Sequence, residues 1–228
     1  MTAPLRQGSD TQQTRIFLVD DHPIVIEGLT QLIQQQPDLT VCGGAADSQG
    51  AMKAVTALKP HLAIVDISLK RGSGLDLIKS LQQRFPKLLI LVLSMHDESL
   101  YAERALRAGA RGFMTKQEAT EKLISAIRRI LAGEIYLDER TTTKFVSQWL
   151  RTPLRKDPSL ISSLSDRELE VFQLIGEGHG TREIADMLHL SVKTIEAYRE
   201  HIKDKLTLHN ATELVQHAIQ WVTSRSSD

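Results

Sequence analysis

Short apolar runs alternate with segments of helical periodicity through the first 133 residues of the chain. The segments between the runs place apolar side chains three or four residues apart, as at Leu75, Ile78 and Leu81, which predicts amphipathic helices. The alternation predicts an α/β fold, a doubly wound parallel sheet with helices on both faces. The third and fourth runs are apolar almost throughout and are expected to be central strands. The five predicted strands are residues 15–20, 39–45, 61–66, 88–94 and 111–116.

The pattern changes after Ile135, and no further strand is expected beyond that residue. Residues 134–161 include Pro153 and Pro158, and they are expected to form a linker with a short helix over residues 138–150. Helical periodicity then returns. The predicted helices are residues 166–177, 181–189, 192–206 and 210–221.

Two polar positions mark the starts of these later helices. Ser165 and Glu168 have the spacing of a capping box, and Ser191 is a favourable N-cap. We therefore expect an α/β domain over residues 15–133, followed by a small all-α domain over residues 162–224.

Composition adds little to this picture. Of the 228 residues, 41% are hydrophobic and 25% charged, which is average for a globular protein of two domains. The formal net charge is zero, so a nucleic-acid or membrane partner would need a local charged patch. The longest apolar run, residues 88–93, is far shorter than the roughly 20 residues of a membrane helix, and the polar N-terminus has no signal-peptide core. We expect a cytoplasmic protein with no membrane partner.

Four of the five predicted strands end on a polar functional group. Asp20 and Asp21 end the first strand, Asp66 the third, Ser94 the fourth and Lys116 the fifth. A strand order of 2-1-3-4-5 would bring these four ends together, beyond the carboxyl ends of the strands where sites form in such sheets. Three carboxylates in one place repel one another unless a cation is present, and oxygen ligands of this kind suit Mg²⁺.

This arrangement predicts phosphoryl chemistry. A carboxylate beside Mg²⁺ can attack phosphorus and form an aspartyl phosphate, and phosphoryl transfer needs mainly positioning and charge neutralisation. Lys116 would pair with phosphoryl oxygens, and the Ser94 hydroxyl would donate to them. Each residue taken singly could also be a turn, cap or surface residue; their convergence favours a site.

The segments "LVDDHPIV", "VDISL" followed by Gly74, "LVLSMHD" and "ARGFMTK" resemble the receiver domain of two-component response regulators. The resemblance implies that a partner sensor histidine kinase phosphorylates Asp66. It also implies Mg²⁺ ligation by Asp20, Asp21, Asp66 and the backbone carbonyl of Ser68.

The same resemblance assigns switch roles. Ser94 would be the switch hydroxyl, Lys116 the phosphate-binding lysine and Phe113 the rotating aromatic residue, with plain core packing as the alternative for Phe113. Lys70 and Gln117 occupy positions where many receivers have proline, which affects loop geometry and leaves the acceptor chemistry in place.

The all-α segment contains the pattern of a helix-turn-helix, "TREIADML" followed by a turn and "VKTIEAYREHIKDKL". In the last of these helices Ile195, Tyr198, Ile202 and Leu206 define a predicted buried face. The opposite face would enter a major groove or would be an ordinary solvated surface. It consists of Lys193, Glu196, Ala197, Glu200 and Lys203.

The net charge of this region is unfavourable for binding DNA. Residues 160–228 hold 7 Lys and Arg against 11 Asp and Glu, so positive charge is only local, and a lone domain is expected to bind weakly and to need pairing.

The segments "LSDRELEV", "GHGTREIADML" and "SVKTIEAYREHIKDKL" resemble the LuxR-type domain of NarL/FixJ-family regulators. The resemblance implies double-stranded DNA as a partner and a phosphorylation-dependent homodimer. Apolar residues of the last helix would form the dimer contact or, alternatively, only pack in the core of their own domain. It places Arg182, Lys193, Thr194 and Arg199 near phosphates, and Glu196, Ala197 and Glu200 near bases, where glutamate could accept from cytosine.

We therefore expect a phosphorylation-dependent DNA-binding transcriptional regulator. Its only enzymatic activity would be Mg²⁺-dependent self-phosphorylation and slow self-dephosphorylation. The main rival is a phosphatase with an aspartyl nucleophile, but such enzymes generally carry a second acid two residues later, where this chain has Ser68. Two further rivals are a receiver that serves only as a passive dimerisation scaffold and a helical domain that binds protein.

Overall fold

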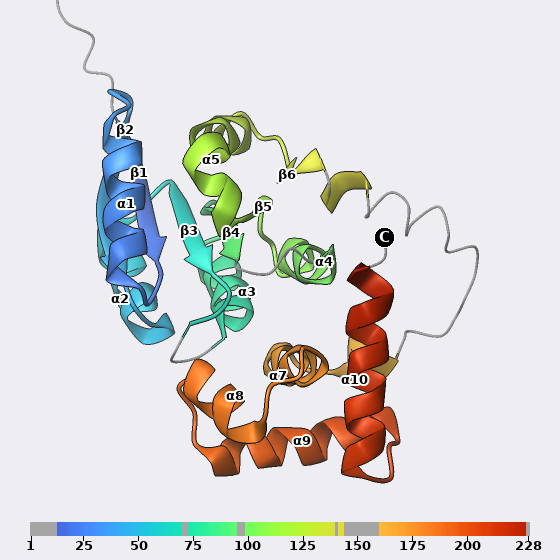
Figure 1. Ribbon diagram of the computed structural model, residues 1–228. Coiled ribbons are helices and arrows are strands. Elements are labelled where there is room, and N and C mark those ends of the chain that lie inside the picture. Colours follow the sequence, from blue (N-terminus) through green and yellow to red (C-terminus); the bar gives the residue numbers. More distant parts are fainter. Residues whose placement is uncertain (1–12, 70–72, 95–98, 140, 144–159, 227–228) are drawn as a thin grey trace, which may run out of the picture. The chain divides into compact units, whose positions relative to one another are not determined.

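The computed structural model describes residues 13–69, 73–94, 99–139, 141–143 and 160–226 (Figure 1). The chain divides into two compact units, residues 1–145 and 146–228.

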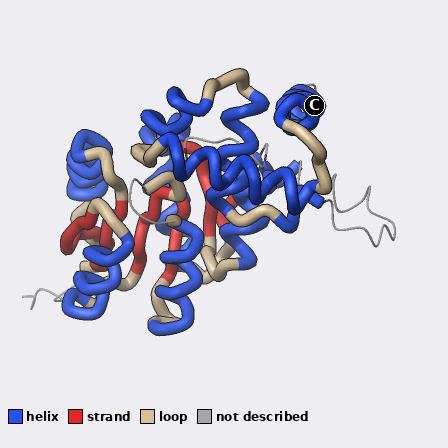
Figure 2. Tube along the Cα trace, turned by 90° about the horizontal axis from the view of Figure 1, so that it is seen from below, coloured by secondary structure: helices blue, strands red, loops and turns tan. Residues whose placement is uncertain are grey.

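The first unit contains a parallel sheet in the order β2-β1-β3-β4-β5-β6. Helices cover both faces of the sheet (Figure 2), which confirms the predicted doubly wound α/β fold. The strands are β1 (Thr14–Val19), β2 (Leu39–Ala45), β3 (Leu62–Asp66), β4 (Leu89–Ser94), β5 (Gly112–Thr115) and β6 (Tyr136–Leu137). The helices are α1 (Pro23–Gln34), α2 (Ser48–Leu58), α3 (Gly74–Arg84), α4 (Ser99–Arg107) and α5 (Lys116–Leu131).

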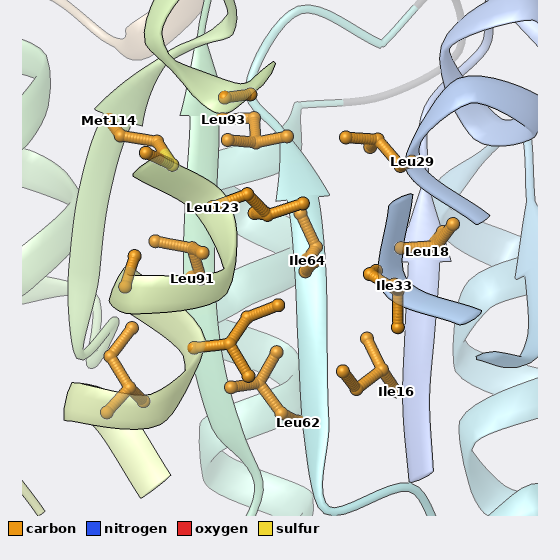
Figure 3. Packing of buried hydrophobic residues seen from close by; sticks show 14 of the residues in the cluster. Ile16, Leu18, Leu29, Ile33, Leu62, Ile64, Leu91, Leu93, Met114 and Leu123 are labelled. Carbon is orange, nitrogen blue, oxygen red and sulfur yellow. The ribbon is translucent and has the colours of Figure 1, made fainter. Parts of the chain in front are cut away.

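One face of the sheet packs against α1 and α5. Leu29 and Ile33 of α1 and Leu123 of α5 lie over alternate residues of the central strands, such as Ile64 and Leu91 (Figure 3). Every residue of β3 is buried, as its continuous apolar sequence predicted. This packing fixes the direction of β1, β3 and β4, and therefore the position of the residues at their carboxyl ends.

The prediction of five strands with none after Ile135 was wrong. Tyr136 and Leu137 form a sixth strand that pairs in parallel with Gly112 and Phe113 of β5. Two residues are too few to show an alternation of polar and apolar positions. Of the helix expected over residues 138–150, residues 139 and 141–143 are helical and residue 138 is not; residues 140 and 144–150 lie outside the described residues.

The second unit is helical throughout its described part. It contains a 3₁₀ turn, η1 (Leu160–Ser163), and helices α7 (Asp166–Gly176), α8 (Thr181–Met187), α9 (Val192–Leu206) and α10 (Ala211–Ser226). The capping box of Ser165 and Glu168 is present, and the Ser191 side chain accepts from the Thr194 N–H. The sequence thus placed the starts of α7 and α9 correctly.

Close packing of α7 and α10 requires a small residue. A Cβ on Gly176 would lie 2.4 Å from the carbonyl oxygen of Ala218, so a larger residue would force these helices apart. Among the described residues, no helix is long and apolar enough to cross a membrane.

Candidate functional site

Three aspartates meet at the carboxyl ends of β1 and β3. Asp20 and Asp21 follow β1 directly, and Asp66 is the last residue of β3, which pairs with β1. Their exposures are 3%, 8% and 2%, so all three carboxylates are largely removed from water. One oxygen from each, together with a ring nitrogen of His22, forms a set of atoms within 4.8 Å of one another. The structure therefore brings together the three acids that the sequence predicted at the ends of strands.

Lys116 reaches the same cluster from the carboxyl end of β5. It is the first residue of α5, directly after β5. Its Nζ lies 2.6 Å from Asp20 Oδ2 and 2.8 Å from Asp66 Oδ2, and its side chain is 10% exposed. One ammonium group offsets only part of the charge of three carboxylates, so the cluster favours an additional cation.

Burial and charge oppose each other at Asp66. Burial is the larger effect and raises the pKa of Asp66 above its usual range, although Lys116 lowers it by attraction and a hydrogen bond. For Lys116 burial lowers the pKa, but Asp66 and Asp20 together outweigh burial and raise the pKa of the ammonium group. The lysine is therefore held in its charged form, whereas the site disfavours the charge on Asp66 when no other cation is bound.

The backbone after β3 fixes Asp66 in place. The N–H of Ser68 donates to Asp66 Oδ1 at 3.1 Å. A Cβ on Gly74 would lie 2.2 Å from the Asp66 carbonyl oxygen and 2.6 Å from the Ile67 Cα, so α3 can begin this close to the acid only with glycine. Lys70, one of the departures from the receiver pattern, lies outside the described residues.

Ser94 and Phe113 lie at the neighbouring strands. Ser94 ends β4 beside Thr115, and the preceding residue of β4, Leu93, pairs with Asp66. The Ser94 hydroxyl thus belongs to the same edge of the sheet as the aspartates. Phe113 lies further back in β5 and, like Ser94, has no exposed surface. Its burial in this state fits core packing and also an inward-facing aromatic switch, so the switch role stays a prediction.

His22 is the residue of this cluster that the sequence reasoning missed. Its Nδ1 lies 2.9 Å from Asp21 Oδ1 and 3.1 Å from Asp20 Oδ1, and its backbone N–H donates to Asp20 Oδ1 at 2.9 Å. The signal was available in the sequence, because the histidine follows the acidic pair directly. Its side chain is 52% exposed, so it lies at the solvent side of the buried acids.

In the second unit, α9 has one buried and one exposed face. Ile195, Ile202 and Leu206 are buried and Tyr198 is partly buried, as their spacing predicted. The residues expected near DNA are exposed at Arg182, Lys193, Glu196, Ala197 and Glu200, and partly exposed at Thr194, Arg199 and Lys203.

Some of these side chains already have partners within the unit. Lys203 Nζ lies 2.8 Å from Glu200 Oε2, so each partly neutralises the other, and the Thr194 hydroxyl forms a hydrogen bond with Ser191. Lys193 and Arg182 stand on the exposed surface at the starts of α9 and α8, where the helix N-termini also favour anions. Of the three cations expected near phosphates, these two are exposed and Arg199 is partly exposed.

An ion pair between the exposed Lys205 and the buried Glu168 links α9 to α7. Lys205 Nζ lies 2.6 Å from Glu168 Oε2, and the same carboxylate accepts from the Ser165 N–H at 2.6 Å. Burial alone would raise the pKa of Glu168, but the hydrogen bonds from Lys205 and Ser165 outweigh it and lower the pKa. One carboxylate thus caps α7 and anchors the end of α9.

Comparison with known families follows the same division of the chain. The model described as "Response regulator receiver domain" matches residues 16–128. The model described as "Bacterial regulatory proteins, luxR family" matches residues 162–218.

Relatives span nearly the whole chain. The oxygen regulatory protein NreC of Staphylococcus carnosus is 38% identical over 212 residues, which is 90% of this chain and 97% of that protein. The NreC of Staphylococcus haemolyticus is 37% identical over 210 residues, with the same shares covered.

Solved structures give the same result. RcsB from Salmonella typhimurium is 28% identical with a TM-score of 0.61, over 92% of this chain and 98% of that chain. A structure of RcsB bound to promoter rprA in the presence of the phosphomimetic BeF3⁻ has a TM-score of 0.60 at 28% identity, over 90% and 98% of the two chains. Family models, relatives and structures agree, and the chain is a two-component response regulator of the NarL/FixJ family, with a receiver domain and a LuxR-type helix-turn-helix domain.

Proposed function

We propose that this protein is a transcription regulator whose binding to double-stranded DNA is controlled by phosphorylation of Asp66. The observation that carries the proposal is the buried cluster at the sheet edge, where Asp66 lies beside Asp20 and Asp21 and Lys116 bridges Asp20 and Asp66. A partner sensor histidine kinase supplies the phosphoryl group.

The residues of the cluster fit a divalent cation. Asp20, Asp21 and Asp66 offer carboxylate oxygens, and the backbone carbonyl of Ser68 offers a further oxygen in the same loop. Such hard oxygen donors suit Mg²⁺, and the single ammonium of Lys116 leaves negative charge uncompensated. When bound, Mg²⁺ neutralises charge on the phosphoryl oxygens and on the carboxylates.

The transfer itself is a substitution at phosphorus. A carboxylate oxygen of Asp66 forms a bond to phosphorus as the bond from phosphorus to the donor histidine nitrogen breaks, and the imidazole leaves with the electron pair of that bond. Lys116 holds its ammonium beside Asp66 Oδ2 and can pair with the transferred phosphoryl oxygens. Water later hydrolyses the acyl phosphate, which accounts for slow self-dephosphorylation.

Ser94 and Phe113 convert the new charge into a change of conformation. The Ser94 hydroxyl donates to a phosphoryl oxygen, and Phe113 adjusts its packing behind it. A phosphoryl group adds charge and strong acceptor oxygens. A differential interaction of about 3 kcal/mol between two conformations changes their ratio roughly 100-fold.

The helical domain supplies the DNA contacts. Relatives support this role, since RcsB structures are bound to promoter DNA and one describes two RcsB dimers on two parallel DNAs. Arg182, Lys193, Thr194 and Arg199 contact phosphates, while Glu196, Ala197 and Glu200 face the bases and Lys203 lies beside them. Because the domain carries net negative charge, binding depends on a homodimer that places two copies on neighbouring half-sites.

The remaining parts of the chain take their roles from this proposal. Residues 15–133 form the phosphorylated domain and residues 162–224 the DNA-binding domain, joined by residues 134–161. A regulator of transcription acts where the chromosome is, which in bacteria is the cytoplasm.

A gel-shift titration tests the proposed function. Genomic fragments from the source organism are titrated with the full chain at fixed salt, with Mg²⁺ present, with and without acetyl phosphate. We expect acetyl phosphate to raise the affinity of the wild-type protein for its target fragments. The matched control, Asp66→Asn, should show no such increase. Equal affinity of the wild-type protein with and without the donor would contradict the proposal.

A further inference from the structure

His22 points a ring nitrogen into the carboxylate cluster. Its Nδ1 lies 2.9 Å from Asp21 Oδ1 and 3.1 Å from Asp20 Oδ1. The ring comes from the first turn after β1, directly after both acids, and its backbone N–H is bound to Asp20 Oδ1. Two independent contacts therefore hold this residue at the mouth of the cluster.

Two of the separations are close to those of neighbouring ligands around an octahedral ion. With bonds of about 2.1 Å, adjacent ligand atoms of an octahedron lie about 3.0 Å apart and opposite ones about 4.2 Å apart. The Nδ1 distances to the two Oδ1 atoms are close to the first value, and the four donor atoms of Asp20, Asp21, His22 and Asp66 all lie within 4.8 Å. An ion could take up these donors with small movements of side chains.

Lys116 and His22 contact different oxygens of the Asp20 carboxylate, which they share. Lys116 binds Asp20 Oδ2 and Asp66 Oδ2, whereas His22 Nδ1 faces Asp20 Oδ1 and Asp21 Oδ1. The lysine and a cation on the His22 side therefore do not compete for the same atoms. The side of the cluster with the half-exposed His22 is also open to ions from solvent.

We propose that His22 is a direct ligand of the cation at this site, through Nδ1, and that it gives the site a preference for Mn²⁺-type transition metals over Mg²⁺. This inference rests on the proposed metal-dependent function and deepens it. Mg²⁺ prefers oxygen donors, whereas imidazole suits first-row transition ions. Three carboxylates with one imidazole form a mixed donor set that still accepts Mg²⁺ but binds Mn²⁺ more tightly.

Electron spin-echo envelope modulation of bound Mn²⁺ tests this directly. The full-length wild-type protein, loaded with less than one equivalent of Mn²⁺, is expected to show modulation from a directly bound ¹⁴N nucleus. Uniform ¹⁵N labelling should replace it with the ¹⁵N pattern. The ¹⁴N signal should be lost in His22→Ala and kept in the control His61→Asn. The control removes another imidazole of the same domain. Its asparagine can still accept from the Arg15 N–H, which donates to His61 Nδ1 at 3.0 Å in the wild-type protein.

Metal affinity provides a second measurement. Titration of Mn²⁺, followed by the loss of the free-ion resonance, and competition by Mg²⁺ give the ratio of the two affinities. We expect His22→Ala to lower the ratio of Mn²⁺ to Mg²⁺ affinity about tenfold or more, with a smaller effect on Mg²⁺ alone. An unchanged ratio would overturn the inference.

The outcomes separate this inference from the proposed function. If Mn²⁺ binds, Asp21→Asn abolishes binding, and no ¹⁴N modulation is seen, then His22 only donates a hydrogen bond to the acids and the inference is wrong, while the phosphorylation site stands. If neither Mn²⁺ nor Mg²⁺ binds the wild-type protein, both the inference and the metal-dependent function are wrong.

Discussion

Removing the charge of Asp66 should stabilise the receiver domain even though it removes the phosphorylation site. The ionised carboxylate is buried next to Asp20, and its pKa is raised despite the attraction of Lys116. A raised carboxyl pKa means that the folded state holds the proton more tightly than the unfolded state. Ionisation of Asp66 therefore lowers the free energy of unfolding as the pH rises from the ordinary carboxyl pKa of 3.8 through the higher folded pKa.

The size of the effect follows from two opposing contributions. In Asp66→Asn, one amide oxygen replaces the two carboxylate oxygens that accept from Lys116 and from the Ser68 N–H, so one of these bonds is lost and the other is weakened, a loss of about 2 kcal/mol. Lys116 keeps Asp20 at 2.6 Å, so it is not left as an unpaired buried charge. The variant avoids the free-energy cost of burying one ionised group, which is several kcal/mol. We expect a net stabilisation of about 1–2 kcal/mol near neutral pH, the range typical of stabilising changes at functional sites.

Urea unfolding in buffer without divalent ions measures this difference, and thermal unfolding should show an increase of about 3–6 °C. The gain should shrink as the pH falls through the folded pKa and below 3.8, because the wild-type carboxyl is then protonated in both states. Mg²⁺ should stabilise the wild-type protein more than the variant, because the folded wild-type protein offers the Asp66 carboxylate as a ligand and the variant does not. Destabilisation of Asp66→Asn by 1 kcal/mol or more without metal would refute this reasoning, because Lys116 would then dominate over burial.

Three further predictions concern other parts of the chain. Gly74→Ala should destabilise the receiver domain by about 1–3 kcal/mol and slow uptake of phosphoryl from acetyl phosphate, because its Cβ meets the Asp66 carbonyl; wild-type unfolding and uptake would contradict this. Glu168→Gln should destabilise the helical domain by about 1–3 kcal/mol above pH 4.5. A lowered carboxyl pKa contributes stability that is present above the unfolded pKa and is lost as the pH falls through the folded pKa. The urea midpoints of the two proteins should therefore converge in acid, and a constant difference would count against the Lys205 pair. Lys193→Ala should weaken DNA binding and reduce the slope of log affinity against log salt by about 1, whereas an unchanged slope would show that this lysine meets no phosphate.

The sequence predicted the sheet and the acid cluster because both depend on regular features. Continuous apolar runs such as residues 61–66 mark buried strands, and parallel strands place their carboxyl ends at one edge. The positions of Asp20, Asp66 and Lys116 followed from this topology alone, and their mutual distances agree with it.

Other features depend on contacts between residues that have no regular spacing. The two-residue strand Tyr136–Leu137 is held by pairing with β5 and by burial of Tyr136, beneath the Arg129 guanidinium, and neither leaves a periodic pattern. The bond between Glu168 and Lys205 joins residues 37 positions apart. The orientation of His22 toward both acids depends on its side-chain torsions at the N-cap of α1, which the sequence does not encode by spacing.

The most direct test of the account is to locate the phosphoryl group. The full chain is incubated with acetyl phosphate and Mg²⁺, reduced with borohydride to convert an acyl phosphate into a stable alcohol, digested and mapped by mass spectrometry. The account predicts that the converted residue is Asp66 alone and that Asp66→Asn gives no product at any acid of the cluster. Modification at another residue, or equal modification of the variant, would contradict it.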